Sequence, residues 1–323
     1  MRAITWPDLL IQRPRTRREA KKVEFIQPSG LREALEARAA HPEARPIAGG
    51  TDIMVEINFD RDRPGAVLDL TGVEELQSWE EAGGRLRVGA GVSYSRIITE
   101  LGERLPGLAM ASRTVGSPQI RNRATVGGNL GTASPAGDAL PPLYADGAEI
   151  EAAALREGSV QSRMVPVAEF ISGPKRNALA EDELIAAFHI PEARGPQQYA
   201  KIGPRNAMVI AVCAFGLSLD VHNEKVAGCT GSAGPTPARV TEAEEFIESV
   251  LDEQRLWQSR QPISDAALAR FGELAAESTR PITDVRGTEA YRRHAVGVLA
   301  KRTLSWAWQE HCEGARKGGS DAA

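Results

Sequence analysis

The sequence feature that most constrains this chain is a glycine-rich turn that occurs twice. The first turn covers residues 47–52 (IAGGTD), and the second covers residues 125–130 (TVGGNL). Glycines lack a Cβ atom, so the backbone can approach a ligand closely and direct N–H groups at it. Either turn alone would more often be an ordinary loop, because Gly-Gly is a common breaker of regular structure. Two turns of the same kind instead predict a clamp that holds a pyrophosphate from both sides.

The segments that follow the turns support an anion site. A helix is predicted over residues 51–58, which would place the first turn at a helix N-terminus, where free N–H groups and the helix dipole favour an anion. Asp52 has a second interpretation as a helix-start residue stabilised by the same dipole. The second turn continues into Ser134-Pro135-Ala136-Gly137-Asp138, after which short strands are expected.

Composition excludes several classes of protein. A chain of 323 residues with 42% hydrophobic residues is long enough for more than one core. The net charge of −4 provides no basic field for nucleic acid, and the short basic run at residues 13–22 is interpreted as a solvated tail or a contact to a partner subunit. No stretch approaches the roughly 20 apolar residues that span a bilayer. Residues 1–22 lack a secretory pattern, so we expect a cytoplasmic protein.

The sequence also argues against metal and nucleophile chemistry in this chain. Three widely spaced cysteines, without a C-x-x-C pair, predict neither a disulfide framework nor a four-thiolate iron–sulfur cluster. The five histidines lack metal-ligand spacing, and no nucleophile elbow or phosphate loop is present. Residues 89–94 begin like a dinucleotide fingerprint, but Tyr94 stands at the third glycine position, so we expect a strand-to-helix turn there. We therefore predict no catalytic side chain and no metal ligand.

Periodicity along the chain predicts an α+β fold in three pieces. Thr241 and Glu244 have the spacing of a helix capping box, and the small, polar tail from Glu313 is expected to be disordered. The predicted helices cover residues 31–40, 263–276 and 288–310. The predicted strands cover residues 66–70, 85–88, 149–154, 162–165, 183–190, 199–202, 209–221 and 225–229, with turns at 157–159 and 222–224.

Several motifs resemble one protein family over residues 25–302. The matching segments are Pro46-Ile47-Ala48-Gly49-Gly50-Thr51-Asp52, residues 120–129 (IRNRATVGGN), Thr236-Pro237-Ala238-Arg239, and Asp284-Val285-Arg286-Gly287-Thr288 with Tyr291-Arg292. Through them the chain resembles the FAD-binding medium subunit of the molybdenum hydroxylases, which include xanthine dehydrogenase and carbon monoxide dehydrogenase.

The resemblance implies an architecture. It is a two-lobed FAD-binding domain of the vanillyl-alcohol-oxidase/PCMH type, followed by a C-terminal antiparallel sheet with helices. The expected division is an N-terminal extension at residues 1–22, an FAD-binding domain at 23–195 with lobes of about 23–80 and 81–195, a C-terminal domain at 196–312, and a disordered tail at 313–323.

The resemblance also implies which residues bind FAD without a covalent bond. Asp138 is expected to accept hydrogen bonds from cofactor hydroxyls, and Lys201 to be the cation near the flavin pyrimidine edge, with an exposed lysine on an edge strand as the alternative. An acidic residue that the family often has after Arg205 is absent, which weakens the Lys201 assignment. Arg121 and its neighbours are expected to order the second turn. The full expected set is Ile47, Ala48, Gly49, Gly50, Thr51, Asp52, Ile53, Val115, Gly116, Ala124, Thr125, Gly127, Gly128, Asn129, Thr132, Asp138, Leu179 and Lys201.

The implied function is electron transfer within a complex. A large molybdopterin subunit would oxidise the substrate, a small subunit with [2Fe–2S] clusters would relay electrons, and FAD on this chain would deliver them to an acceptor. A dimer of such heterotrimers is expected. The alternatives are a self-contained FAD oxidoreductase of the same fold and a flavin-free assembly scaffold. Substrate and acceptor are left open by the sequence.

Overall fold

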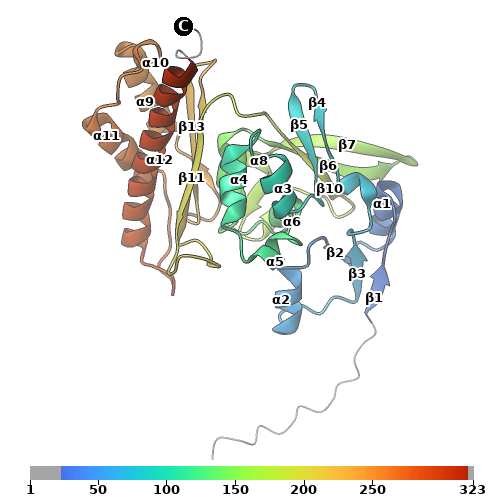
Figure 1. The fold of residues 1–323 in the computed structure, drawn as a ribbon. Helices are drawn as coiled ribbons and strands as arrows, with labels where there is room; N and C mark the ends of the chain where they lie inside the picture. The colour runs from blue at the N-terminus through green and yellow to red at the C-terminus, as the bar shows by residue number, and fades with distance from the viewer. Residues whose placement is uncertain (1–22, 319–323) are drawn as a thin grey trace, which may run out of the picture.

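The computed structural model describes residues 23–318 of the chain. The predicted N-terminal extension, with its basic run, and residues 319–323 lie outside the described residues. The described part is a mixed helix-and-sheet structure that confirms the predicted α+β class (Figure 1). No helix within residues 23–318 is long and apolar enough to cross a membrane.

The N-terminal lobe is built on a small parallel sheet with the strand order β1-β3-β2. Its strands are β1 (Glu24–Ile26), β2 (Arg45–Ile47) and β3 (Ala66–Asp69), and its helices are α1 (Leu31–Ala40) and α2 (Ile53–Asn58). Because the strands are parallel, β2 and β3 end at the same edge of the sheet. The first glycine turn leaves the sheet at this edge, directly after β2.

The middle lobe is an antiparallel sheet with the order β4-β5-β10-β6-β7 and a set of short helices. The β6–β7 hairpin turns at Glu157 and Gly158, which have φ of 50° and 75°, as the sequence predicted. The strands are β4 (Trp79–Ala82), β5 (Arg85–Gly89), β6 (Glu149–Arg156), β7 (Ser159–Pro166) and β10 (Leu184–Ile190), beside the small pair β8 (Ile171–Gly173) and β9 (Arg176–Asn177). The helices are η2 (Glu74–Leu76), α3 (Tyr94–Glu100), α4 (Pro106–Arg113), α5 (Pro118–Arg121), α6 (Val126–Thr132), α7 (Leu140–Ala145) and α8 (Val167–Phe170).

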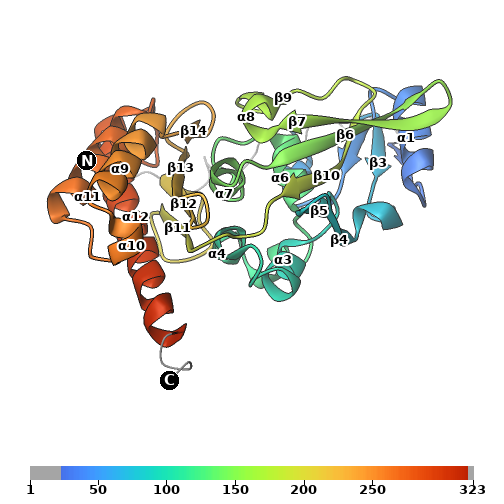
Figure 2. The same ribbon diagram turned by 90° about the horizontal axis from the view of Figure 1, so that it is seen from above.

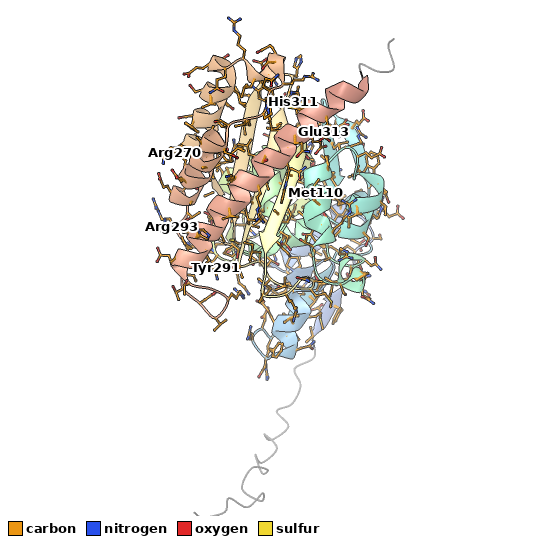
Figure 3. The ribbon with its side chains drawn as sticks, turned by 60° about the vertical axis from the view of Figure 1, so that its left-hand side comes forward. Met110, Arg270, Tyr291, Arg293, His311 and Glu313 are labelled. Carbon is orange, nitrogen blue, oxygen red and sulfur yellow. The ribbon has the colours of Figure 1, made fainter. Side chains whose placement is uncertain are left out.

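The C-terminal domain is a four-stranded antiparallel sheet, β11-β12-β13-β14, with helices on its outer face. Figure 3 shows α12 running across this layer, with Tyr291 and Arg293 near one end and His311 near the other. The opposite face of the C-terminal sheet meets α4 and α7 of the middle lobe (Figure 2). The elements are β11 (Gln197–Ile202), β12 (Cys213–Asp220), β13 (Lys225–Gly231), β14 (Ala238–Arg239), α9 (Thr241–Glu253), α10 (Leu256–Ser259), α11 (Asp265–Glu277) and α12 (Glu289–Gly318).

The hydrophobic interior forms two main clusters. One is shared by the N-terminal and middle lobes, and the other lies between the C-terminal sheet and its helices. Cys213 and Cys229 are fully buried, one in each cluster, and burial raises the pKa of both thiols. No disulfide bond is present within the described residues.

Several sequence expectations are corrected by the structure. The capping box at Thr241 is wrong: the N-cap of α9 is Val240, which has no side-chain cap bond, and Glu244 instead accepts from Gly228 N–H at 2.8 Å. The predicted disordered tail is wrong for residues 313–318, because α12 continues to Gly318. The helix predicted from residue 51 begins at Ile53, because residues 51 and 52 form a turn and Asp52 is the N-cap. The strand predicted from residue 209 begins at Cys213.

Two glycines set the distance between α11 and α12. A Cβ atom on Gly272 would lie 2.5 Å from Gly297 O, and a Cβ atom on Gly297 would lie 3.0 Å from Gly272 O. The backbones of the two helices therefore touch directly. Since neither carbonyl can move without displacing a whole helix, the contact tolerates no side chain.

We expect Gly272→Ala to destabilise the chain by about 1–3 kcal/mol, because the new methyl group forces the two helices apart. Gly314→Ala is the matched control, since Gly314 is likewise a helical glycine, in α12, but a Cβ atom there meets nothing within 4 Å. Denaturant unfolding of both variants measures the difference. Equal stability of the two variants would show that the helix contact is not tight.

Candidate functional site

The two glycine turns meet each other in the structure, as the doubled motif predicted. A Cβ atom on Gly49 would lie 2.1 Å from Arg123 O and 2.8 Å from Ala124 Cα, so only glycine allows this approach. Across the same junction, Thr132 Oγ1 donates to Asp52 Oδ2 at 3.4 Å. Residues that are about 75 positions apart in sequence thus form one continuous lining. A cavity of about 210 Å³ lies beside the junction and is lined by Ala48, Gly49, Arg123 and Thr125 among others.

The first turn presents a row of unused backbone donors. Within the described part of the chain, the N–H groups of residues 48–53 make no hydrogen bond to another protein group. The left-handed φ of 75° at Gly50 turns the chain back on itself, and Met54 N–H then donates to Gly50 O at 3.1 Å to begin α2. Such a run of N–H groups at the start of a helix is suited to an anion.

The second turn forms the N-terminus of α6. Thr125 is the N-cap, and its Oγ1 accepts from Gly128 N–H at 2.8 Å. Gly127 packs against the residue that directly follows β5, because a Cβ atom there would lie 2.4 Å from Ala90 O. Asn129 Oδ1 is buried and has no hydrogen-bond partner, which is rare for a side-chain oxygen in a folded protein. Gly137 lies against this amide: a Cβ atom on Gly137 would be only 2.6 Å from Asn129 Nδ2.

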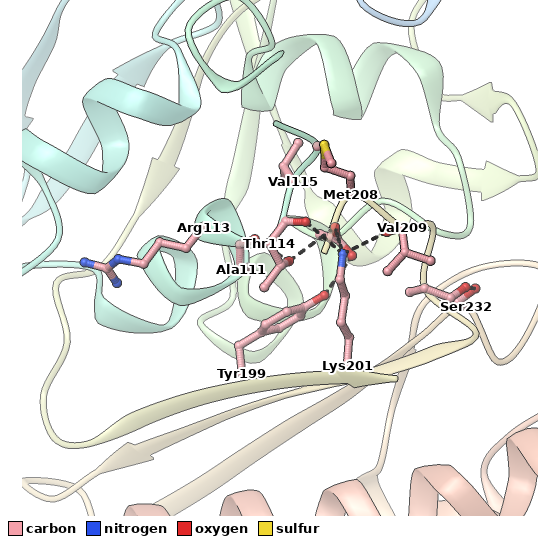
Figure 4. Close-up of polar contacts among 12 residues, drawn as sticks. Ala111, Arg113, Thr114, Val115, Tyr199, Lys201, Met208, Val209 and Ser232 are labelled. Carbon is pink, nitrogen blue, oxygen red and sulfur yellow. Dashed lines mark hydrogen bonds and ion pairs between the residues drawn. The ribbon is translucent and has the colours of Figure 1, made fainter. Parts of the chain in front are cut away.

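Lys201 and Asp138 form a buried ion pair. Figure 4 shows the Lys201 side chain with the hydrogen bonds of its ammonium group drawn as dashed lines. Lys201 Nζ lies 2.7 Å from Asp138 Oδ2, and the two side chains are only 8% and 10% exposed. Lys201 also donates to Thr114 O at 3.0 Å and to Val209 O at 3.1 Å, so all three ammonium hydrogens have acceptors. The alternative of an exposed lysine is therefore wrong, although β11 is an edge strand.

Asp138 was expected to accept hydrogen bonds from cofactor hydroxyls, but several of its hydrogen bonds come from protein groups. Besides Lys201, its carboxylate accepts from Tyr199 Oη at 2.9 Å and from Thr114 Oγ1 at 3.4 Å. Burial raises the pKa of the Asp138 carboxyl, and the Lys201 ammonium is the strongest influence that opposes this rise. Burial also raises the pKa of the Tyr199 phenol well above its ordinary value, so this hydroxyl stays a donor. Tyr199 and Thr114 were not among the predicted site residues.

The loop at Val115 and Gly116 is held by Arg121. Arg121 Nη1 donates to the carbonyls of Val115 at 3.0 Å, Gly116 at 3.1 Å and Arg113 at 3.2 Å. These bonds hold the loop before α5 and do not reach the second turn, which Arg121 was expected to order. Gly116 has a φ of 45°, and a Cβ atom there would lie 2.7 Å from the Ile120 side chain.

The remaining predicted positions border one of the two turns or its flank. Ala124 directly precedes the N-cap of α6, and Ile53 begins α2. Leu179 follows β9, whose Asn177 Nδ2 donates to Gly131 O of α6 at 2.9 Å. Within residues 23–318, no group of three or more histidine, cysteine, aspartate or glutamate residues could hold a metal ion.

Comparison with known proteins assigns the two parts of the chain. Residues 21–193 match the family model described as "FAD binding domain in molybdopterin dehydrogenase". Residues 198–307 match the model described as "CO dehydrogenase flavoprotein C-terminal domain". The boundary between the two matches falls just before β11, the strand that carries Lys201.

Individual relatives agree with the family models. The chain is 31% identical over 242 residues to the nicotinate dehydrogenase FAD-subunit of Eubacterium barkeri, covering 70% of this chain and 80% of the relative. It is 28% identical over 286 residues to the xanthine dehydrogenase FAD-binding subunit of Escherichia coli O157:H7, covering 85% and 92%. In fold it is similar to quinoline 2-oxidoreductase from Pseudomonas putida 86, with a TM-score of 0.80, 23% identity, and 90% and 98% of the two chains covered. The chain therefore belongs to the FAD-binding medium subunits of the molybdenum hydroxylase family, and its cofactor is FAD.

Proposed function

We propose that this chain is the electron-transfer flavoprotein of a multi-subunit molybdenum hydroxylase. The observation that carries the proposal is the junction of two glycine turns, whose unpaired N–H groups and left-handed Gly50 suit a pyrophosphate. When bound, FAD would accept electrons from one protein-bound centre and release them to an external acceptor. The chain's own residues bind and orient the cofactor, and none is proposed as a general acid or base.

In this proposal the first turn binds one side of the pyrophosphate and the second turn binds the other. Backbone N–H groups of residues 48–53 and the free N–H groups at the start of α6 would neutralise the phosphates. The unpartnered Asn129 amide lies next to Gly137, and a polar cofactor group that reaches it would satisfy its oxygen. Both observations fit an FAD that occupies the junction between the lobes.

We propose a different role for Lys201 from that of a free cation. Its hydrogen bonds all go to protein acceptors, and its charge is balanced by Asp138 at 2.7 Å. The pair joins the extension of the second turn to the first strand of the C-terminal domain. Lys201 and Asp138 would therefore set the position of the C-terminal sheet beside the flavin, while contributing little net charge there.

The expected partners are an iron–sulfur subunit and a molybdopterin subunit, assembled as a dimer of heterotrimers. The names of the relatives support this, since nicotinate dehydrogenase in Eubacterium barkeri has a separate FAD-subunit. We also propose a division into domains at residues 23–195 and 196–312, and a cytoplasmic location, which suits a chain with no disulfide bond among its described residues. Because no metal-binding group of side chains lies within the described part and neither turn contains a histidine that could serve as a general base, the self-contained oxidoreductase is the weaker candidate.

The bound flavin should be FAD held without a covalent bond, because neither turn contains a histidine or cysteine that could attach to the ring. The purified chain should be yellow, and acid precipitation should release FAD rather than FMN into the supernatant. Chromatography of the supernatant identifies the flavin. Colour that remains with the protein pellet would contradict the non-covalent assignment.

Gly50→Val should abolish FAD binding, since the new side chain would stand against the row of free N–H groups. Losing two or three hydrogen bonds to a charged group, at about 1.5–3 kcal/mol each, weakens binding by several orders of magnitude. Gly158→Val is the matched control because both glycines have a φ of 75°, so the two variants carry similar backbone strain. Flavin content per chain is measured for both. Wild-type flavin content in Gly50→Val would rule out the clamp.

The isolated chain should bind FAD and yet oxidise no organic substrate. The reason is that the described residues contain no group that could hold a metal ion, and neither turn contains a histidine that could act as a general base on a substrate. Anaerobic bleaching of the flavin absorbance is followed with purines, aldehydes and aromatic substrates, first with the single chain and then with the co-expressed partners. Rapid bleaching of the single chain by any of these substrates would favour the self-contained oxidoreductase. Slow reduction by NADH alone would not favour it, because electron transfer from the flavin to an acceptor such as NAD⁺ can run in reverse.

A further inference from the structure

Helix α2, which follows the first glycine turn, is attached to the middle lobe by two polar contacts. Asp52, its N-cap, accepts from Thr132 Oγ1 at 3.4 Å, and Glu56, one turn later, accepts from Lys175 Nζ. Residues four apart lie on the same face of a helix, so both carboxylates face the middle lobe. The two contacts join segments that are 80 and 119 positions apart in the sequence. The pair of Glu56 and Lys175 is named the interlobe bridge.

Lys175 reaches α2 from a short hairpin that is fixed to the helix of the second turn. It lies between β8 and β9 and has a left-handed φ of 56°. Its backbone N–H donates to the O atom of Ala133, the C-cap of α6, at 2.9 Å. Asn177 Nδ2 of the same hairpin donates to Gly131 O at 2.9 Å. The position of the Lys175 ammonium group is therefore set by the helix that begins at the second glycine turn.

These contacts connect the two turns in a closed ring. The first turn runs into α2, the interlobe bridge joins α2 to the hairpin, and the hairpin is bonded to α6, which begins at the second turn. Expected cofactor-binding positions flank the bridge on both sides, with Asp52 and Ile53 on α2 and Thr132 and Leu179 on the middle lobe. A cofactor held by both turns leaves when the lobes part at this place, and parting the lobes breaks the bridge.

The interlobe bridge is the part of this ring that opens most easily. The Lys175 side chain is 62% exposed and the Glu56 side chain is 19% exposed. An exposed ion pair contributes a modest free energy and is screened by salt. Opening it leaves no unpaired buried charge, because Arg45 lies 3.8 Å from Glu56 and the lysine is open to water. The bridge can therefore break without unfolding either lobe.

We propose that the interlobe bridge is a gate for the cofactor, which holds the two turns together and must break before FAD enters or leaves. This inference rests on the proposed function. Both partners are protein groups, so the bridge forms with or without FAD. Its removal therefore speeds uptake and release by the same factor and leaves the equilibrium affinity for FAD unchanged. Glu56 and Lys175 are positioning residues, and neither takes part in electron transfer.

The test measures FAD release and uptake with the full chain. Release is followed by the rise in free-FAD fluorescence after the loaded chain is diluted, and uptake by its fall when FAD is added to the flavin-stripped chain. At low ionic strength, Lys175→Met and Glu56→Gln should each raise both rate constants about two- to fivefold, as expected of an exposed ion pair. Lys175→Arg should keep the wild-type rates. In about 1 M salt, the difference between wild type and Lys175→Met should disappear, because the bridge is screened.

The matched control is Lys225→Met in the C-terminal domain. Lys225 Nζ lies 2.7 Å from Glu248 Oε2, and the two side chains are 64% and 21% exposed, close to the values for the interlobe bridge. The control removes the same charge from the same kind of pair, but β13 and α9, which carry this pair, belong to one domain. Both rate constants of this variant should equal those of the wild type.

The two rate constants together decide between the possible roles. Faster release with equally faster uptake in both Lys175→Met and Glu56→Gln supports the gate, since the two variants remove opposite charges. Wild-type rates in either variant at low ionic strength overturn the gate and leave the proposed function standing. Faster release with unchanged or slower uptake also overturns it, because the pair would then stabilise only the loaded chain. A wild-type chain that neither carries nor takes up FAD overturns the proposed function itself.

Discussion

A contact between two stretches of backbone, at Gly49 and Arg123, holds the N-terminal lobe on the middle lobe at the candidate site. No side chain takes part, since a Cβ atom on Gly49 would lie 2.1 Å from the Arg123 carbonyl. Gly127 makes the equivalent approach to Ala90 within the middle lobe. Gly50 is required for a different reason, its positive φ. Neighbouring glycines of one motif therefore serve separate purposes, the first fixing the lobes and the second shaping the ligand-facing turn.

The second turn is also connected to the C-terminal domain through polar groups. Asp138 binds Lys201 and Tyr199 of β11, and three residues earlier Pro135 O accepts from Ser232 N–H at 2.9 Å. Ser232 O in turn accepts from the buried Arg292 of α12 at 2.7 Å, and Arg292 pairs with Asp284. The segment 134–138 is thus fixed from two directions by one domain. This explains why the motif around Asp284 and Arg292 accompanies the glycine turns, although it lies far from them in sequence.

Local patterns predicted the parts of this structure that depend on local chemistry. The glycine turns, the β6–β7 hairpin and helices such as α1 follow from residue types within a few positions. Helices α6 and α7 were missed because their sequences, VGGNLGT and LPPLYA, contain glycine and proline that disfavour helix on their own. Tertiary contacts, and not local helix propensity, make these two segments helical. The same holds for Glu244, whose spacing from Thr241 suggested a cap, while Arg239 and the Gly228 N–H compete successfully for its carboxylate.

The site was predictable to the extent that its residues lie in the turns. Which residues surround Asp138 depends on how β11 packs against α4, and no pattern in the sequence reports that packing. Tyr199 had a faint signal, as an aromatic residue two positions before Lys201 and hence on the same face of the strand. Thr114 had none, because its carbonyl acts only once Lys201 of the C-terminal domain is in place, and its hydroxyl meets Asp138 only through the fold of the middle lobe.

The buried cysteines have a consequence for a protein that works with a redox cofactor. Reduced flavins can leak electrons to oxygen, and the peroxide formed attacks thiolates far faster than thiols. Cys213 and Cys229 have no solvent access, and burial favours their protonated form by raising the pKa, for Cys213 to about 12. These two side chains are therefore chemically silent. Sulfenic acid is therefore not expected to form at either of these two cysteines.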